Sequence, residues 1–253
     1  MRTPQCLVGT SGWSYPHWGK GRFYPKGLKP GEWLHHFAQH FPTVEVNSSF
    51  YRLPRQEMVV RWREVTGPRF QFAVKVWRRI THEKRLVDCS AELRDFLAVA
   101  GQFAGKRGPL LVQLPPSMHK DTGLLEAFLA DLKAAIGRTR WKVAVEFRHP
   151  DWICEPVYEL LDRHGAAVCL ADMERCPITR PNNVGFVYVR RHGPGGRYRG
   201  CYSPEHLAAD TEHIRAWLSA GRHVYVYFNN DAEGHAVDNA RQLMQLVETA
   251  GSA

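Results

Sequence analysis

Residues 141–152, WKVAVEFRHPDW, contain the unit from which the whole chain is built. Residues 143–147 form an apolar, β-branched run of strand length, and a Pro-Asp pair then ends the strand before an amphipathic helix begins. Glu146 and Arg148 are two positions apart at the end of this run, so they share one face of the predicted strand. Because buried charges are costly unless they are paired or liganded, the strand end is a candidate site.

Strand and helix patterns alternate along the rest of the chain. Strands are predicted at 6–12, 43–49, 69–77, 109–115, 143–147, 166–172, 184–192 and 224–230. Helices are predicted at 31–40, 55–66, 90–103, 122–136, after the fifth strand up to residue 163, and at 203–220 and 236–249. An irregular basic loop replaces the helix after the sixth strand.

This alternation predicts a single (β/α)8 TIM-like barrel of eight parallel strands, with one crossover helix, after strand six, replaced by a loop. No Gly/Ser-rich linker or change of composition divides the chain, so we expect one domain over residues 1–253. An open doubly wound sheet is the alternative. A nucleotide-binding sheet of that type carries GxGxxG after its first strand, and residues 9–13, GTSGW, do not match that motif.

Composition limits the class of protein. The sequence has no apolar run of about 18 residues, and its first residues, MRTPQCLVG, lack the features of a signal peptide, so we expect a cytoplasmic protein without a membrane partner. Six cysteines show no CxxC or zinc spacing, and Cys6 and Cys169 fall in predicted strands, which favours reduced, buried thiols. A formal charge of +9 favours anionic partners.

Polar residues collect at the ends of the predicted strands, where a TIM barrel builds its active site. The candidate catalytic residues are Glu45, Lys75, Glu146 and Asp172. The candidate substrate-binding residues are Trp13, Asn47, Tyr51, His82, Gln113, Arg148, Arg190, His192 and Asn229. Nearly every strand contributes one of these side chains, which is why we predict a functional pocket at this end.

Three chemistries fit these residues, and none has a diagnostic spacing. Glu45 and Glu146 are a candidate acid and base pair. Lys75, if it is desolvated beside Arg148, is a candidate low-pKa amine for a Schiff base, although a salt bridge from Lys75 to Glu45 or Glu146 is the simpler expectation. The third chemistry is a metal site with oxygen and nitrogen ligands, made of Glu146, Asp172 and His192. The cofactor and the oligomeric state stay open.

The loops after the strands carry about half of the lysines and arginines, with aromatic residues among them. The basic residues include Lys20, Arg22, Arg52, Arg78, Arg79, Lys84, Arg85, Arg175, Arg180, Arg191, Arg197 and Arg199. Such a surface suits a phosphorylated small molecule or a nucleic acid. The sharpest local case is 190–200, RRHGPGGRYRG, for which an ordinary solvated glycine loop is an equally good interpretation.

Several motifs resemble the YecE-like family, also called domain of unknown function seventy-two. They are GTSGWSYPHWGKGRFYP (9–25), TVEVNSSFYRLP (43–54), FAVKVWRRITH (72–82), LLVQLPP (110–116), VEFRHPDW (145–152) and YFNND (227–231). The resemblance implies a TIM-like barrel with signature residues around its C-terminal mouth, and it implies no established reaction.

The leading hypothesis is an enzyme that acts on a phosphate-bearing substrate, with nucleic acid as one candidate and phosphoester hydrolysis as one candidate reaction. In it Glu146 is the general base or a metal ligand, Arg148, Lys75 and Arg190 bind phosphate, and Trp13 and Tyr51 stack on the substrate. The alternatives are a sugar hydrolase or isomerase that uses Glu45 and Glu146, and a non-catalytic nucleic-acid-binding module that uses the basic loops.

Overall fold

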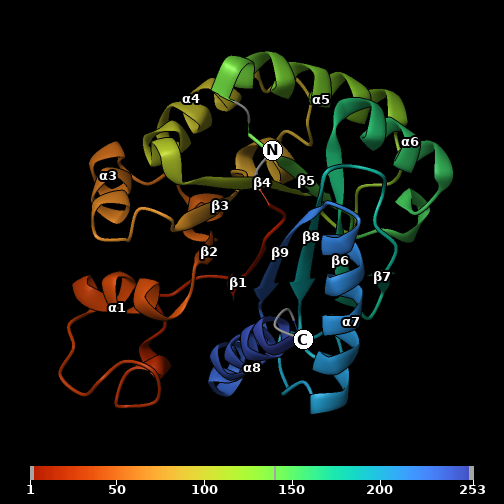
Figure 1. Cartoon of the computed structure of the whole chain (residues 1–253). Coiled ribbons are helices and arrows are strands. Elements are labelled where there is room, and N and C mark those ends of the chain that lie inside the picture. Colours follow the sequence, from red (N-terminus) through yellow and green to blue (C-terminus); the bar gives the residue numbers. More distant parts are fainter. Residues whose placement is uncertain (1–2, 140, 251–253) are drawn as a thin grey trace.

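Eight parallel strands form a nearly closed barrel with helices around it, as the sequence predicts (Figure 1). The computed structural model describes residues 3–139 and 141–250. The barrel strands are β1 (Cys6–Thr10), β2 (Thr43–Val46), β3 (Gln71–Lys75), β4 (Arg107–Gln113), β5 (Val143–Glu146), β6 (Ala166–Met173), β8 (Phe186–Arg191) and β9 (His223–Phe228). The loop after β6, predicted to lack a helix, contains the short strand β7 (Cys176–Ile178), which pairs antiparallel with β6.

Seven helices agree with the predicted ranges to within a few residues at most ends, whereas the single-turn helix α2 (Ser48–Tyr51) was not predicted and begins where the strand predicted at 43–49 was expected to continue. The helices are α1 (Trp33–His40), α2, α3 (Gln56–Glu64), α4 (Ser90–Ala100), α5 (Thr122–Ile136), α6 (Glu155–His164), α7 (Pro204–Ser219) and α8 (His235–Ala250). Side chains fix some of their starts: Asp121 accepts a hydrogen bond from the Leu124 amide at 2.9 Å at the start of α5. A π-helical turn, Arg79–Glu83, follows β3, where the sequence predicted only a loop.

The strands follow the order β1-β9-β8-β6-β5-β4-β3-β2, and β1 and β2 close the ring through a single parallel bridge between Ser11 and Glu45. The amide of Gly12 donates to the Glu45 carbonyl at 2.9 Å across this seam. Gly9 is required here, because a Cβ on it would lie 2.1 Å from the carbonyl oxygen of Thr43. The closure therefore brings Ser11 of the first strand beside Glu45 of the second.

The barrel interior is filled by large rings from one side and small residues from the other. Tyr188 on β8 and Tyr227 on β9 are fully buried, while β3, β5 and β6 contribute the small residues Ala73, Ala144 and Ala167. This pairing of large with small side chains fills the narrow interior of the barrel. The ionic residues lie above this layer, at the carboxyl ends of the strands.

Two expectations from composition can be compared with the structure. Within residues 3–139 and 141–250, no helix is both long enough and apolar enough to span a bilayer. All six cysteines are free; Cys169 is buried as expected, Cys6 is partly exposed and Cys201 is exposed.

Candidate functional site

Arg190 is the centre of a buried ionic network at the carboxyl ends of the strands. It lies on β8, and only 1% of its surface is exposed. Its Nη2 and Nε lie 2.8 and 3.0 Å from the two carboxylate oxygens of Glu45, and its Nη1 lies 2.7 Å from Oε2 of Glu146. One guanidinium therefore binds two carboxylates, one from β2 and one from β5, in a fixed fork geometry.

Glu45 has two further hydrogen-bond donors. The Ser11 hydroxyl donates to Oε1 at 2.5 Å, and the Tyr188 hydroxyl donates to Oε2 at 2.6 Å. Burial alone would raise the pKa of Glu45, but the positive charge and hydrogen bonds of Arg190, with those of Ser11 and Tyr188, hold it below its usual value. The carboxylate is thus ionised and fully satisfied.

We expect Tyr188→Phe to lower the free energy of unfolding by about 1.5–3 kcal/mol, because a buried carboxylate loses a donor that nothing replaces. Tyr225→Phe is the matched control, since the Tyr225 hydroxyl donates to a neutral acceptor, Gln71 Oε1, at 3.1 Å and should contribute only about 1 kcal/mol. Urea denaturation of both variants at pH 7 measures the difference. Equal losses would show that Glu45 does not need the Tyr188 hydroxyl.

Glu146 is held between two arginines. Its Oε1 lies 2.5 Å from Nη2 of Arg148, opposite the contact of Oε2 with Arg190. Burial would raise the pKa of Glu146, but Arg148 and Arg190 outweigh it and lower the pKa to about 2. Arg148 in turn donates to the hydroxyl of the partly exposed Tyr198 at 2.8 Å, so it connects the buried network to the rim of the mouth.

The ionised state of both carboxylates bears on the acid and base pair expected from the sequence. A glycosidase needs one carboxyl group with a raised pKa to protonate the leaving group. The pKa values of Glu45 and Glu146 are both lowered, and both side chains are fully buried. This geometry does not favour the sugar hydrolase interpretation, and it makes Glu146 a weak general base.

His192 separates Asp172 from the two arginines. Its Nε2 lies 3.1 Å from Nη1 of Arg190 and 3.4 Å from Nη2 of Arg148. Guanidinium nitrogens only donate, so Nε2 is the acceptor and the ring proton is on Nδ1, which lies 3.4 Å from Oδ1 of Asp172. Burial lowers the pKa of His192 and keeps the ring neutral.

The same arrangement argues against the metal site considered from the sequence. Glu146 lies 3.7 Å from Nε2 of His192, whereas Asp172 faces Nδ1 on the other edge of the ring. Asp172 also accepts hydrogen bonds from the Tyr202 hydroxyl and from the backbone N–H of His192, which lies 2.7 Å from Oδ1. One ion cannot lie beside both nitrogens, so these three residues do not converge on a single position.

Lys75 differs from the other ionic residues because no described side chain pairs with it. In residues 3–139 and 141–250, its Nζ makes neither an ion pair nor a hydrogen bond, so the expected salt bridge to Glu45 or Glu146 is wrong. The ammonium instead lies 3.9 Å from the centroid of the Phe50 ring. Burial and the positive charge of Arg190 lower its pKa to about 7.

Three other predicted binding residues lie at or near the mouth. His82, on the π-helical turn, packs edge-on against Phe50, which also contacts Lys75. Burial and the nearby cations, Lys75 first among them, lower the pKa of His82 to about 4. Trp13 and Asn47 line a cavity of about 490 Å³ between the loop after β1 and helices α1 and α3. Oδ1 of Asn47 is buried without a hydrogen-bond donor among the described residues.

The other predicted binding residues are placed less favourably. Tyr51 is 70% exposed, and Gln113 is buried with its amide bonded to the Leu114 carbonyl at 3.4 Å. Asn229 is partly exposed, whereas its neighbour Asn230 is buried and bonds to Asn239 at 2.9 Å.

Some polar residues of the network are not among the predicted site residues. Tyr188 and Tyr202 bind Glu45 and Asp172. Tyr188 lies within a strand and looks like an ordinary core residue, whereas Tyr202 lies in the loop before α7, and no local pattern indicates which carboxylate either hydroxyl contacts.

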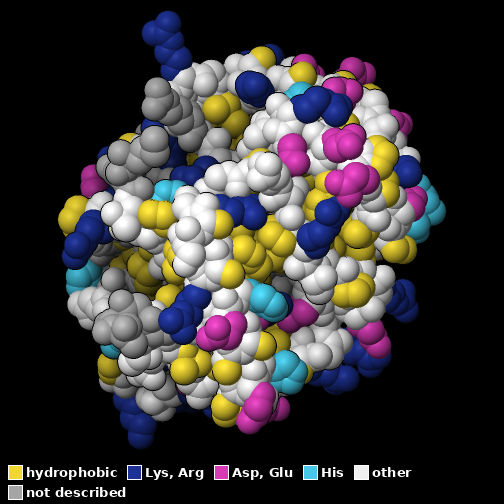
Figure 2. Space-filling model, turned by 45° about the vertical axis from the view of Figure 1, so that its right-hand side comes forward, with side chains coloured by type: hydrophobic (Ala, Val, Ile, Leu, Met, Phe, Trp, Pro, Cys, Tyr) yellow, Lys and Arg dark blue, Asp and Glu magenta, His cyan; other side chains and the backbone are white. Residues whose placement is uncertain are grey.

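The basic loops are less positive than their sequence suggests. Acidic side chains pair with many of their cations: Arg78 with Glu83, Arg79 and Lys84 with Glu92, Arg180 with Glu155, Arg191 with Asp210, and Arg197 with Glu174. On the face shown in Figure 2, basic and acidic side chains are interspersed and form no continuous basic patch. The nucleic-acid-binding interpretation loses much of its support on this surface.

Comparison with known proteins places this chain in a family. A family model described as "Protein of unknown function DUF72" matches residues 7–253. The UPF0759 protein YunF of Bacillus subtilis is 26% identical over 95% of this chain and 94% of its own length. The UPF0759 protein YecE of Escherichia coli K12 is 28% identical over 74% of this chain, which spans 66% of that protein.

Solved structures agree with the fold. A DUF72 family protein from Thermotoga maritima superposes with a TM-score of 0.85 at 29% identity, over 96% of this chain and 99% of that one. A DUF72 family protein from Enterococcus faecalis superposes with a TM-score of 0.82 at 19% identity, over 96% of both chains.

Proposed function

Because the chain belongs to the DUF72 family, described only as of unknown function, we propose its function from the site itself. The protein is an enzyme that acts on a phosphate-bearing substrate at the C-terminal mouth of the barrel, and the amine of Lys75 is the reacting group. The observation that carries this proposal is the unpaired Nζ of the largely buried Lys75, whose pKa is lowered to about 7.

A lysine in this state can do chemistry that an ordinary surface lysine cannot. At neutral pH about half of the molecules hold Lys75 as the free amine, which accepts a proton or attacks a carbonyl carbon. In the second case the nitrogen adds to the carbonyl, and loss of water leaves an imine. Lys75 therefore replaces Glu146 as the general base, since Glu146 holds its proton too weakly.

A phosphate-bearing substrate is supported by the cations around Lys75. Arg190 and Arg148 both lower its pKa, and Arg78, Arg148 and Arg85 also lower that of the neighbouring His82. His82 therefore lies in a positive potential, which favours the arrival of an anion, whereas around Lys75 the carboxylates of Glu146 and Glu45 partly offset the two arginines. Among these cations, Arg148 contacts the partly exposed Tyr198 at the rim, so we assign it to phosphate binding.

Arg190 does not fit the phosphate-binding role expected from the sequence. Its three nitrogens already contact Glu45 and Glu146, and it is 1% exposed. We assign Arg190, Glu45 and Glu146 to positioning: they hold Arg148 and keep a fixed positive charge near Lys75. The proposed substrate-facing groups are Lys75, His82 and Arg148, with Trp13 and Asn47 in the neighbouring cavity.

Pyridoxal phosphate followed by borohydride tests the amine and the phosphate preference together. The aldehyde forms an imine with a free amine, and reduction makes the adduct permanent. We expect Lys75 to be the lysine labelled fastest at pH 7.5, because most of it is then the free amine. Inorganic phosphate should protect it, and pyridoxal without the phosphate should react several-fold more slowly. Peptide mapping by mass spectrometry gives the labelled position.

Lys106 is the matched control, because its Nζ donates to the carbonyl oxygens of Arg63 and Thr66 and is not available. Labelling spread over exposed lysines, with Lys75 unmodified, would contradict the reactive amine. Labelling of Lys75 that phosphate does not slow, but that a neutral sugar does, would contradict the phosphate-bearing substrate.

A further inference from the structure

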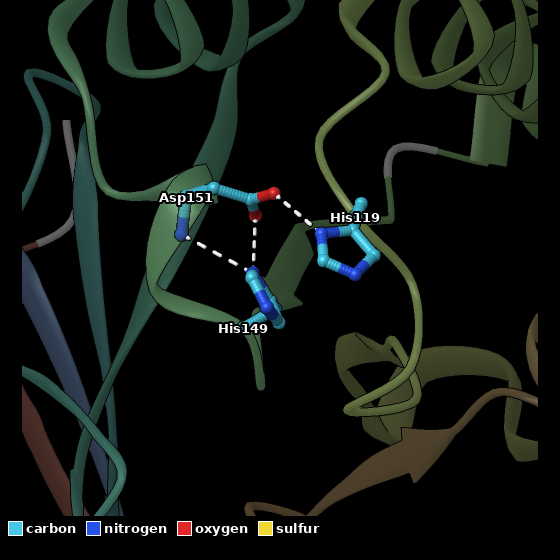
Figure 3. Close-up of side chains that lie close together, drawn as sticks. All are labelled: His119, His149 and Asp151. Carbon is cyan, nitrogen blue, oxygen red and sulfur yellow. Dashed lines mark hydrogen bonds and ion pairs between the residues drawn. The ribbon is translucent and has the colours of Figure 1, made fainter.

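A second cluster of ligand-type side chains lies beside the mouth and is not used by the chemistry of Lys75. His149 and Asp151 belong to the loop after β5, and His119 belongs to the loop after β4. One ligand atom from each lies within 4.8 Å of the others. Figure 3 shows the two imidazoles and the carboxylate pointing toward one another from the two loops.

The carboxylate of Asp151 faces both rings. Its Oδ2 lies 3.1 Å from Nδ1 of His119, and its Oδ1 lies 2.7 Å from Nδ1 of His149. Ligands of a tetrahedral zinc ion with bonds of about 2.0–2.1 Å stand roughly 3.3 Å apart, so small movements of these side chains would admit an ion. The ring centroids of the two histidines are 4.1 Å apart, so the two imidazoles pack against each other beside the carboxylate.

A proton or a metal ion can hold this cluster together. Nδ1 of His149 lies 2.7 Å from Oδ1 of Asp151, a distance at which a protonated Nδ1 donates a hydrogen bond to the carboxylate. A ring with its proton on Nε2 instead presents the lone pair of Nδ1 to the carboxylate, and a metal ion then takes the place of the shared proton.

The two loops are held in place around the cluster. The indole N–H of Trp152 donates to the Met118 carbonyl at 2.7 Å, and both side chains are buried. The backbone N–H of Lys120 donates to Oδ2 of Asp151 at 3.1 Å. These contacts hold the two loops together and fix the Asp151 carboxylate before any ion binds, as the outer contacts of metal sites do.

We propose that His119, His149 and Asp151 bind a divalent transition metal ion, with Zn²⁺ as the best match to two imidazole nitrogens and one carboxylate oxygen. Three protein ligands leave a fourth position for water or an anionic ligand. His119 is mostly exposed, so an ion can enter from solvent. The site is independent of Lys75, because none of its ligands contacts that amine.

Zinc titration of protein first stripped with a chelator tests the site. Competition with a chromophoric chelator should show one equivalent of Zn²⁺ bound by the wild type. Asp151→Asn and His149→Ala should each weaken binding by about 100-fold or more, since even outer contacts of metal sites are worth 10–100-fold. Co²⁺ should give a visible absorption spectrum in the wild type that both variants lose.

His36→Ala is the matched control, because His36 and His40 form an imidazole pair with centroids 4.7 Å apart on α1, away from Asp151. This variant should bind Zn²⁺ like the wild type. Circular dichroism checks that Asp151→Asn and His149→Ala stay folded. Equal zinc affinity in the wild type and Asp151→Asn, or loss of binding in His36→Ala, would overturn the proposed site.

Discussion

Replacing Arg190 with methionine is expected to lower the free energy of unfolding by about 3–5 kcal/mol at pH 7, or roughly 6–10 °C in Tm for a chain of this size. The change leaves Glu45 and Glu146 fully buried, and it removes the guanidinium that binds both of them. An unpaired buried carboxylate is far more costly than a missing surface ion pair. Urea and thermal denaturation measure the loss.

The pH dependence of this loss has a definite sign. In the wild type, burial raises the pKa values of Glu45 and Glu146, but the arginines lower them more. Both values therefore lie below the unfolded value of 4.5. The stability that these groups contribute is therefore complete above pH 4.5 and is lost as the pH falls through their folded pKa values. Without Arg190, burial raises the pKa of Glu45, while Glu146 keeps only Arg148, so the gap in stability between wild type and variant should narrow as the pH falls.

Arg180→Met is the matched control for Arg190→Met. Arg180 pairs with Glu155 at 2.7 Å, but both side chains are more than 60% exposed, so this pair should contribute less than about 1 kcal/mol. A loss for Arg190→Met no larger than for Arg180→Met would mean that the buried carboxylates do not depend on the shared guanidinium.

The ring of ionic residues could be predicted because each strand carries its own signal. Glu45 and Glu146 interrupt apolar runs near predicted strand ends, and parallel strands bring those ends to one face of a barrel. Their contacts could not be predicted. Arg190 reaches both carboxylates because β8 follows β6 in the sheet with Ala171 opposite Arg190, and a register of that kind has no local sequence signal.

For the basic loops the prediction was too strong, because counting charges within each loop overestimated the positive charge of this surface. Arg79 and Lys84 look like free cations in a loop, but helix α4 begins just afterwards and places Glu92 against both. A count along the loop misses an acid that the next helix supplies. The zinc candidate was missed for a related reason, since His119 lies 30 residues before His149 and meets it only because β4 pairs with β5.

Replacing Lys75 with methionine should stabilise the protein, in contrast to the effect expected at Arg190. The pKa of Lys75 falls from 10.5 to about 7 on folding, because of burial first and the nearby Arg190 second. The unfolded chain thus binds the proton more tightly, so below about pH 7 the folded protein carries the full penalty of a buried ammonium ion. Methionine has a similar length and no charge, so we expect a gain of about 2–4 kcal/mol at pH 6.

The gain should shrink as the pH rises from 7 toward 10.5. Over this range Lys75 of the folded wild type has already released its proton, and the free energy that the unfolded chain gains by binding that proton falls with rising pH. Lys106→Met should have the opposite sign, since Lys106 donates to three oxygens of Arg63 and Thr66, which lose their donor. Thermal denaturation at pH 6 and pH 9.5 compares the variants. A stability that Lys75→Met leaves unchanged at pH 6 would show that Lys75 finds a partner or solvent in the folded protein. A stabilised variant would show that the fold keeps a destabilising lysine, as expected where a site uses that lysine.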